Sequence, residues 1–193
     1  AQLIMHTEPK DPHGQDLGHI VKQLGLDSDR QVLFSTQKIA LEHMGSFYNM
    51  ADITINISDA EGFGLATLES LSCGTPIIAN MTGGLQEQVI GPEGENGVAI
   101  FPSSKAVIGS QQVPYIYEDR ISKESFMAAL DKMYFIDEEA RRELGMQGHR
   151  HVRQNYSFED FEKQWVETML KVYEDHSSWS TKNYSSIVFK EIA

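Results

Sequence analysis

Two carboxylates, Glu61 and Glu69, lie eight positions apart in the segment SDAEGFGLATLESLSCGTPIIAN, which covers residues 58–80. Between them comes the run Gly62–Gly64, followed directly by a helical pattern. Carboxylates repel a phosphate, but they accept hydrogen bonds from hydroxyl groups such as those of a sugar. The glycines keep side chains away, so that a ligand can approach the backbone closely. The spacing alone is not specific in so acidic a chain. Combined with EGFG before the helix and CGTPII after it, the spacing favours a ligand with hydroxyls at both ends and an anion in the middle, as in a nucleotide sugar.

The elements that must position these residues alternate between short apolar runs and helix-length patterns. We expect strands over residues 2–6, 31–35, 52–58 and 75–80, and helices over residues 16–26, 41–50 and 65–73. This order predicts an α/β fold, namely a Rossmann-like parallel sheet with helices on both faces. Ligands of such sheets bind outside the carboxyl ends of the strands. The strand over residues 52–58 delivers the glycine-containing loop to that edge.

The helix expected from Leu65 supplies the anion-binding part of this arrangement. The first N–H groups of a helix have no partner within the helix, and together with the helix dipole they favour a phosphate. Glu61 lies before this helix and Glu69 lies about a turn and a half into it. We therefore expect the two carboxylates to flank the amide cluster.

The pattern changes beyond Asn80. The sequence predicts a Gly-Gly turn at residues 83–84 followed by a short helix, a brief strand over residues 97–100, and helices over residues 122–135 and 137–156. A last helix is expected from about Phe158, because Ser157 is a good N-cap and two acidic residues follow in the first turn. Residues 102–120 are long and irregular for a compact domain, so we expect either a functional loop or a surface excursion.

Composition excludes several classes of function. The net charge of −12 argues against a general binder of nucleic acid or of anionic membranes, since both need a basic surface. No apolar run reaches the length of a membrane span. Cys73 is the only cysteine, so no internal disulfide forms, and a reducing, cytoplasmic location is expected. We expect Cys73 to be a small core residue.

Metal and hydrolase chemistry find little support. The chain has seven histidines, but His149 and His151 are two positions apart on a predicted helix and point to different sides. The other histidines offer no matched ligand set, so we predict no metal site. A G-x-S-x-G element, which would place a nucleophilic serine, does not occur.

The stretch EGFGLATLESLSCGTPIIANMTGGLQE resembles the signature of the retaining glycosyltransferases of group 1 (family 4), which have the GT-B fold. These enzymes carry an E-x7-E motif in their C-terminal, nucleotide-sugar-binding domain. The resemblance runs from residue 2 to about residue 161 and is strongest over residues 51–87. It implies that Glu61, the predicted catalytic residue, contacts hydroxyls of the transferred sugar, and that Glu69 binds the ribose hydroxyls. It also implies that the backbone of four residues holds the sugar and diphosphate, namely Gly62, Phe63, Gly64 and Leu65.

The same resemblance implies further contacts with the donor. It places Gln37 and Lys38 beside the base, and it matches Gly83 and Gly84 to a GG-x-x-E element in which Glu87 caps and braces the turn. The implied donor is a UDP- or GDP-linked sugar, and neither a cofactor nor a metal is needed. The implied acceptor is a hydroxyl of a glycan, lipid or protein. We expect the intact enzyme to be cytoplasmic or peripheral at a membrane.

The sequence departs from the family in what precedes the predicted first strand. Family members carry an Arg and a Lys for the diphosphate just before that strand, and an acceptor-binding N-terminal domain before them. We therefore expect residues 1–156 to be a donor-binding domain without its first strand. Residues 157–193, including Trp179, would be a helix and tail that cross to the missing domain. The fragment alone is expected to be inactive.

Two alternatives stay open at this point. The chain could be a non-catalytic module that binds a nucleotide sugar without turnover. It could also belong to a GT-B nucleotide-sugar epimerase, although that function accounts less well for the pairing of EGFG with a second glutamate.

Overall fold

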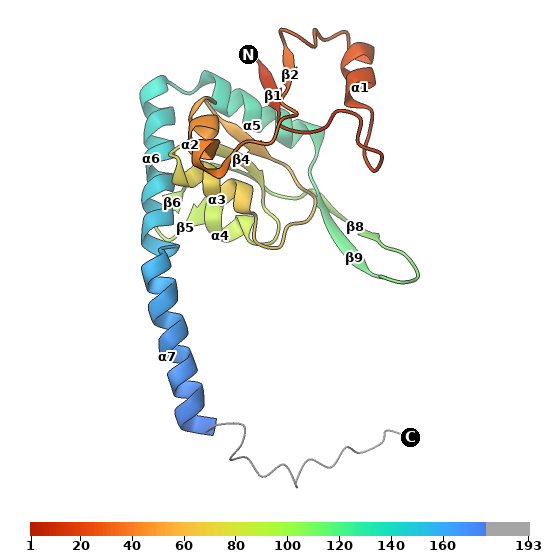
Figure 1. Ribbon diagram of the computed structural model, residues 1–193. Helices are drawn as coiled ribbons and strands as arrows, with labels where there is room; N and C mark the ends of the chain where they lie inside the picture. The colour runs from red at the N-terminus through yellow and green to blue at the C-terminus, as the bar shows by residue number, and fades with distance from the viewer. Residues whose placement is uncertain (177–193) are drawn as a thin grey trace. The chain divides into compact units, whose positions relative to one another are not determined.

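The computed structural model describes residues 1–176; residues 177–193, which include Trp179 of the predicted tail, lie outside the described residues (Figure 1). The chain forms two compact units, Ala1–Met44 and Gly45–Ala193. Helix α2 (Leu41–Asn49) contains the boundary between them. The predicted site residues from Glu61 onward all belong to the second unit.

The first unit contains a β-α-β arrangement. Strand β1 (Leu3–Met5) pairs in parallel with β2 (Val32–Phe34). Helix α1 (Leu17–Gln23) lies between them in the sequence, and the carboxylate of its N-cap, Asp16, accepts the backbone N–H of His19 at 2.9 Å. This bond satisfies one of the amides that a helix start leaves unpaired. The predicted order of strand, helix and strand is present in this unit.

A three-stranded parallel sheet forms the centre of the second unit. Its strand order is β3 (Thr54–Asn56), β4 (Ile77–Asn80) and β7 (Val98–Ile100). All four residues of β4 are buried, as expected for a parallel strand that lies between two others and is covered on both faces.

Helices cover both faces of this sheet, and β4 contributes to the core on each side. Its Ile77 and Ala79 pack with Leu71 in one cluster, whereas Ile78 packs with Met133 in the other. Successive side chains of a strand point to opposite faces, which explains this division. The first cluster is covered by α3 (Leu65–Ser72), α4 (Leu85–Val89) and α6 (Glu138–Asn155), and the second by α5 (Lys123–Phe135), all labelled in Figure 1. The predicted α/β fold with helices on both faces is confirmed.

Residues 102–120 form a surface excursion, one of the two expected alternatives, but they are regular where the sequence indicated an irregular segment. They form an antiparallel hairpin of β8 (Ser104–Ile108) and β9 (Ile116–Arg120), and Figure 1 shows it projecting from the unit that carries the sheet. Neither strand contains a buried residue. The alternation of apolar and polar residues that marks a half-buried strand is therefore missing from the sequence. A shorter hairpin of β5 (Ile90–Gly91) and β6 (Gly94–Glu95) precedes β7.

The last three described helices begin at capping side chains. Ser122 and Asp137 cap α5 and α6. At the start of α7 (Phe158–His176) the hydroxyl of Ser157 accepts the backbone N–H of Asp160 at 3.1 Å, which confirms the predicted start. Over residues 1–176, none of the helices combines the length and the apolar character that a membrane span needs.

Candidate functional site

The loop that follows β3 carries Glu61 and holds its carboxylate in place. The Ser58 hydroxyl donates to Glu61 Oε1 at 3.0 Å, and Asn56 Nδ2 donates to the same oxygen at 3.4 Å. Asn56 Nδ2 also donates to Thr67 Oγ1 at 3.0 Å, which ties the end of β3 to α3. Within the described residues Glu61 Oε2 has no hydrogen-bond partner. This half-buried carboxylate is therefore oriented and keeps one oxygen available to accept from a ligand hydroxyl.

The turn at Gly83 and Gly84 packs directly against this loop. The backbone N–H of Gly84 donates to the carbonyl oxygen of Gly62 at 2.9 Å. A Cβ at Gly84 would lie 2.5 Å from the carbonyl oxygen of Phe63, and a Cβ at Gly83 would collide with that of Glu61. Only residues without side chains permit this approach. The structure thus brings together the predicted donor residues of the loop and of the turn.

Gly64 and Gln88 complete the packing between the loop at residues 61–64 and helix α4. Gly64 has φ +86°, in the left-handed region, and a Cβ there would collide with the side chain of Leu85. The side chain of Gln88, fully buried, donates from Nε2 to the carbonyl oxygen of Phe63 at 2.7 Å. The predicted bracing of the turn by Glu87 is not found: the Glu87 side chain is exposed and has no hydrogen bond to the turn among the described residues, whereas Gln88 holds the loop through Phe63. The role of Gln88 was not predicted, because nothing in the neighbouring sequence distinguishes it from an ordinary polar residue on a helix surface.

A run of backbone amides at the start of α3 has no hydrogen-bond partner within the described residues. Within residues 1–176, none of the backbone N–H groups from Gly62 to Thr67 donates a hydrogen bond to the protein, and the first bond of α3 runs from Leu68 to Gly64 at 3.3 Å. The carbonyl groups of Gly62 and Phe63 are used by the neighbouring turn and helix. Unpartnered amides beside a helix N-terminus form a site that favours an anion. Leu65, which opens the helix, is two-thirds exposed.

Glu69 lies on α3 and has a partner that the sequence did not reveal. The hydroxyl of Tyr48 donates to Glu69 Oε2 at 2.8 Å, while Glu69 Oε1 has no hydrogen-bond partner in the described part of the chain. Burial, and then the hydrogen bond and the charge of Glu69, raise the pKa of Tyr48 above its ordinary value, so that the phenol stays a donor. Burial and then the Glu69 charge also raise the pKa of the Cys73 thiol. The Glu69 carboxylate is therefore held in place and available to hydroxyl donors.

Gln37 and Lys38 lie in the first unit, between β2 and α2, and both side chains are exposed. Their predicted contact with the base of a nucleotide stays a prediction.

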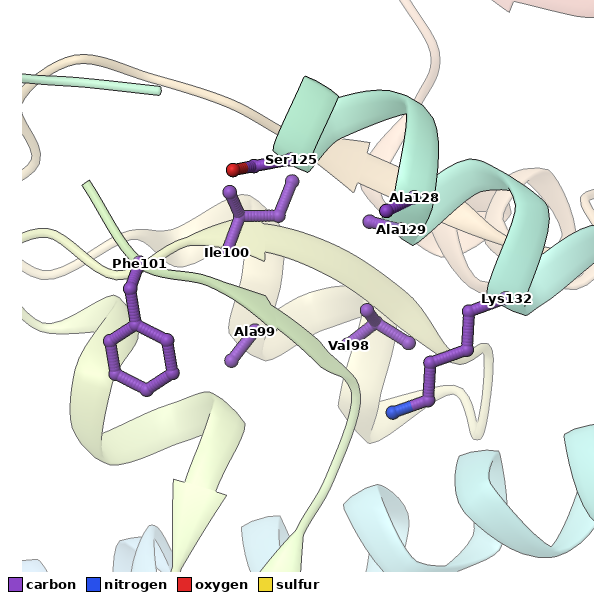
Figure 2. Close-up of a pocket in the computed structure, with 8 residues that line it drawn as sticks. All are labelled: Val98, Ala99, Ile100, Phe101, Ser125, Ala128, Ala129 and Lys132. Atoms are coloured by element: carbon purple, nitrogen blue, oxygen red, sulfur yellow. The ribbon is translucent and has the colours of Figure 1, made fainter. Parts of the chain in front are cut away.

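A cavity of about 350 Å³ lies away from these loops, between β7 and α5. Figure 2 shows Phe101 and Lys132 at its sides, and its other lining residues are Val98, Ala99, Ile100, Ser125, Ala128 and Ala129. The Lys132 ammonium group is 3.4 Å from Glu95. Apart from these groups the lining is mostly aliphatic and has no carboxylate, so this cavity does not account for the predicted chemistry.

Among residues 1–176 no three or more His, Cys, Asp or Glu side chains gather in a way that could hold a metal ion. His149 instead contacts the carbonyl oxygen of Ser72 at 2.6 Å, and His151 that of Glu87 at 3.1 Å. Both rings thus link α6 to the layer it covers.

Known proteins resemble this chain in sequence and in fold. A trehalose synthase from Pyrococcus horikoshii is 27% identical over 114 residues, which are 58% of this chain and 26% of that protein. The chain therefore spans about a quarter of the length of that relative. Sucrose-phosphate synthase from Thermosynechococcus elongatus superposes with a TM-score of 0.64 at 25% identity, over 90% of this chain and 38% of that one.

The Anabaena protein HepE, solved in complex with UDP-glucose, superposes with a TM-score of 0.60 over 81% of this chain and 36% of that one. At 18% identity this likeness shows the fold alone. The match to a family model is more direct, since residues 17–133 fit the model of the glycosyl transferases group 1. That region is more than half of the chain and contains every predicted donor residue. The chain belongs to the group 1 family of glycosyl transferases.

Proposed function

We propose that this chain binds the nucleotide diphosphate sugar of a glycosyltransferase that moves the sugar to an acceptor hydroxyl with retention at the anomeric carbon. The observation that carries the proposal is the run of unpartnered amides from Gly62 to Thr67, flanked in sequence by Glu61 and Glu69. An anion and hydroxyl groups are the two chemistries that such a corner accepts.

Each group then has a distinct role. The backbone amides at the start of α3 bind the diphosphate and stabilise the negative charge that grows on it as it leaves. Glu61 accepts hydrogen bonds from hydroxyls of the transferred sugar through its available oxygen, and Glu69 does the same for the ribose. Glu61 acts as a positioning group: the acceptor oxygen attacks the face from which the diphosphate departs, and the acceptor proton passes to the departing phosphate oxygen.

The donor is proposed to carry UDP or GDP. The fold shared with HepE, which was solved with UDP-glucose, supports UDP as the first candidate. The acceptor, a glycan, lipid or protein hydroxyl, would meet this site through a further domain of the intact enzyme. Because the chain spans only 26% of the trehalose synthase it matches, we expect the 193 residues to bind donor without transferring sugar. The intact enzyme is proposed to act in the cytoplasm.

Donor binding by the 193-residue chain tests the proposal. UDP-glucose and GDP-mannose are screened for a rise in melting temperature, and the Kd of the one that stabilises the chain is measured by calorimetry. Glu69→Ala should raise that Kd by about 10- to 100-fold, which corresponds to the ~1.5–3 kcal/mol of a hydrogen bond to a charged group. The control is Glu167→Ala, since Glu167 is exposed on α7 and its side chain has no hydrogen bond or ion pair with any other residue of the described range 1–176.

Two results would contradict the proposal: no shift with either nucleotide sugar, or equal Kd values for the two glutamate variants. A separate assay follows release of UDP or GDP in the presence of an acceptor. Binding with no release in the intact protein would favour a non-catalytic module, and conversion of the donor to an isomeric nucleotide sugar would favour an epimerase.

A further inference from the structure

The root of the β8–β9 hairpin is bonded to the loop that carries Glu61. The backbone N–H of Asp119 in β9 donates to the carbonyl oxygen of Asp59 at 2.7 Å. The guanidinium group of Arg120 lies 3.0 Å from the Asp59 carboxylate. The hairpin therefore is not an independent excursion: its last two residues hold the segment just before Glu61.

Asn80, the last residue of β4, is bonded both to the segment before Glu61 and to strand β9. Its side chain is fully buried, and Nδ2 donates to the carbonyl oxygens of Ser58 and of Asp119, both at 2.8 Å. Ser58 in turn donates its hydroxyl to Glu61. A buried amide whose two N–H groups are both used in this way fixes the positions of both carbonyl groups.

Thr82 links the hairpin to the second loop of the site. Its hydroxyl, in a side chain only 4% exposed, donates to Asp119 Oδ2 at 2.9 Å. The next two residues are Gly83 and Gly84, whose backbone presses against residues 61–63. Asp119 Oδ1 faces the ammonium group of Lys105 on the other strand of the hairpin at 3.5 Å. The Asp119 carboxylate thus connects the hairpin with the residue before the glycine turn. The Asp119 backbone connects the hairpin with the loop that carries Glu61.

We propose that Asn80, Thr82 and Asp119 are positioning residues of the donor site. They hold the loop that carries Glu61 and the Gly83–Gly84 turn in the arrangement that leaves the amides of residues 62–67 without a protein partner. Hydrogen bonds to a half-buried carboxylate are stronger than neutral ones, so their loss releases both loops together. This inference rests on the proposed function for its effect on donor affinity, but its effect on loop conformation does not need a ligand.

The test compares Thr82→Val with Thr82→Ser in the full 193-residue chain. Valine has the shape of threonine without the hydroxyl, whereas serine retains the hydroxyl. Hydrogen exchange of the Gly84 amide, which donates to Gly62, reports the contact between turn and loop without any donor present. We expect Thr82→Val to exchange this amide about tenfold faster relative to amides of β4, as the loss of a ~1.4 kcal/mol contact predicts, and Thr82→Ser to stay near the wild type.

The matched control is Ser122→Ala, which removes a hydroxyl contact with Ser125 at the start of α5; although Ser122 follows β9 closely in the sequence, its hydroxyl has no bond to the Glu61 segment or to the glycine turn among the described residues. If Thr82→Val changes Gly84 exchange no more than Ser122→Ala does, the inference is overturned. If the wild type binds a nucleotide sugar, Thr82→Val should also raise its Kd about tenfold and Thr82→Ser should not. Failure of the wild type to bind any nucleotide sugar contradicts the proposed function, while the exchange result still decides this inference.

A second pair of variants decides the question if Thr82→Val does not fold. Asp119→Asn keeps an oxygen that accepts the Thr82 hydroxyl, whereas Asp119→Ala removes it. We expect rapid Gly84 exchange only in Asp119→Ala. Equal exchange in the two Asp119 variants would overturn the inference.

Discussion

The hydroxyl of Tyr48 donates a 2.8 Å hydrogen bond to Oε2 of Glu69, across a sequence separation of 21 residues. Tyr48 lies near the end of α2 and Glu69 in the middle of α3. The bond leaves the second carboxylate oxygen free to accept from a ligand while it restricts the rotation of the side chain. Tyr48 is therefore a positioning partner of a residue that we propose to bind the ribose.

We predict that Tyr48→Phe weakens donor binding without unfolding the protein. The variant loses the phenol hydroxyl, so Glu69 keeps its charge but loses its orientation. The Kd of the nucleotide sugar should rise by about 3- to 10-fold, in line with the ~0.5–1.5 kcal/mol net value of a hydrogen bond. Calorimetry measures this change, and Tyr134→Phe on the exposed surface of α5 is the control. Identical donor affinities of the two variants would show that Tyr48 does not contribute to donor binding.

Gly84→Ala and Gly62→Ala should separate packing from ligand contact. A Cβ at Gly84 would lie 2.5 Å from Phe63 O and 3.0 Å from Gly62 O, whereas one at Gly62 meets no heavy atom within 4 Å. Gly84→Ala is therefore expected to lower the free energy of unfolding by ~1–3 kcal/mol, as overpacking does. Gly62→Ala should change stability by less than about 0.5 kcal/mol, yet weaken donor binding, because the methyl group occupies space that the ligand needs. Urea denaturation and calorimetry give the two quantities, and unaltered donor affinity in Gly62→Ala would place the ligand elsewhere.

Stability should fall at alkaline pH through two tyrosines. Burial, followed by the hydrogen bond with Glu69, raises the pKa of Tyr48, and burial, followed by the charge of Glu87, raises that of Tyr156. A raised pKa means that the fold prefers the neutral phenol. The resulting stabilisation is fully present below the unfolded pKa of about 10 and is lost as the pH rises above it.

We therefore expect these tyrosines to add no pH dependence between pH 7 and about 9, and to lower the free energy of unfolding above about pH 10. Urea denaturation across pH 8 to 11 measures the decline, and Tyr48→Phe should make it shallower. A decline of the same steepness in that variant would show that Tyr48 does not contribute.

The single cysteine should react slowly in the folded protein. Burial and then the Glu69 charge raise the pKa of Cys73, so the thiolate that attacks a disulfide reagent is scarce at pH 8. Glu69→Gln removes the charge and should speed the reaction several-fold, while unfolding in urea should speed it further. Absorbance after mixing with an aromatic disulfide follows the rate. A slower reaction in Glu69→Gln would contradict the electrostatic part of this explanation.

The sequence alone was sufficient for the parts of this protein that depend on local order. The expected strands and helices around residues 52–80 match β3, α3 and β4. β-branched residues mark β3, burial on both faces gives β4 its apolar run, and the glycines mark the turn before α3. The family resemblance matched the glycine turn to an element near the donor site, and the structure shows why glycines stand there, since Cβ atoms at positions 83 and 84 cannot be accommodated against residues 61–63.

Tertiary structure decided which side chains support these residues. Tyr48, Thr82 and Asp119 have no distinguishing local pattern, because each acts on a partner that is 21 or more residues away in the sequence or lies in a different element. The hairpin at residues 104–120 was not predicted for a related reason. Its strands have no buried face, so their sequence lacks the alternation of apolar and polar residues by which a strand is recognised. Spacing in a sequence encodes the elements, whereas only the packing of β3, β4 and β9 brings the hydrogen-bonding groups of distant residues within reach of one another.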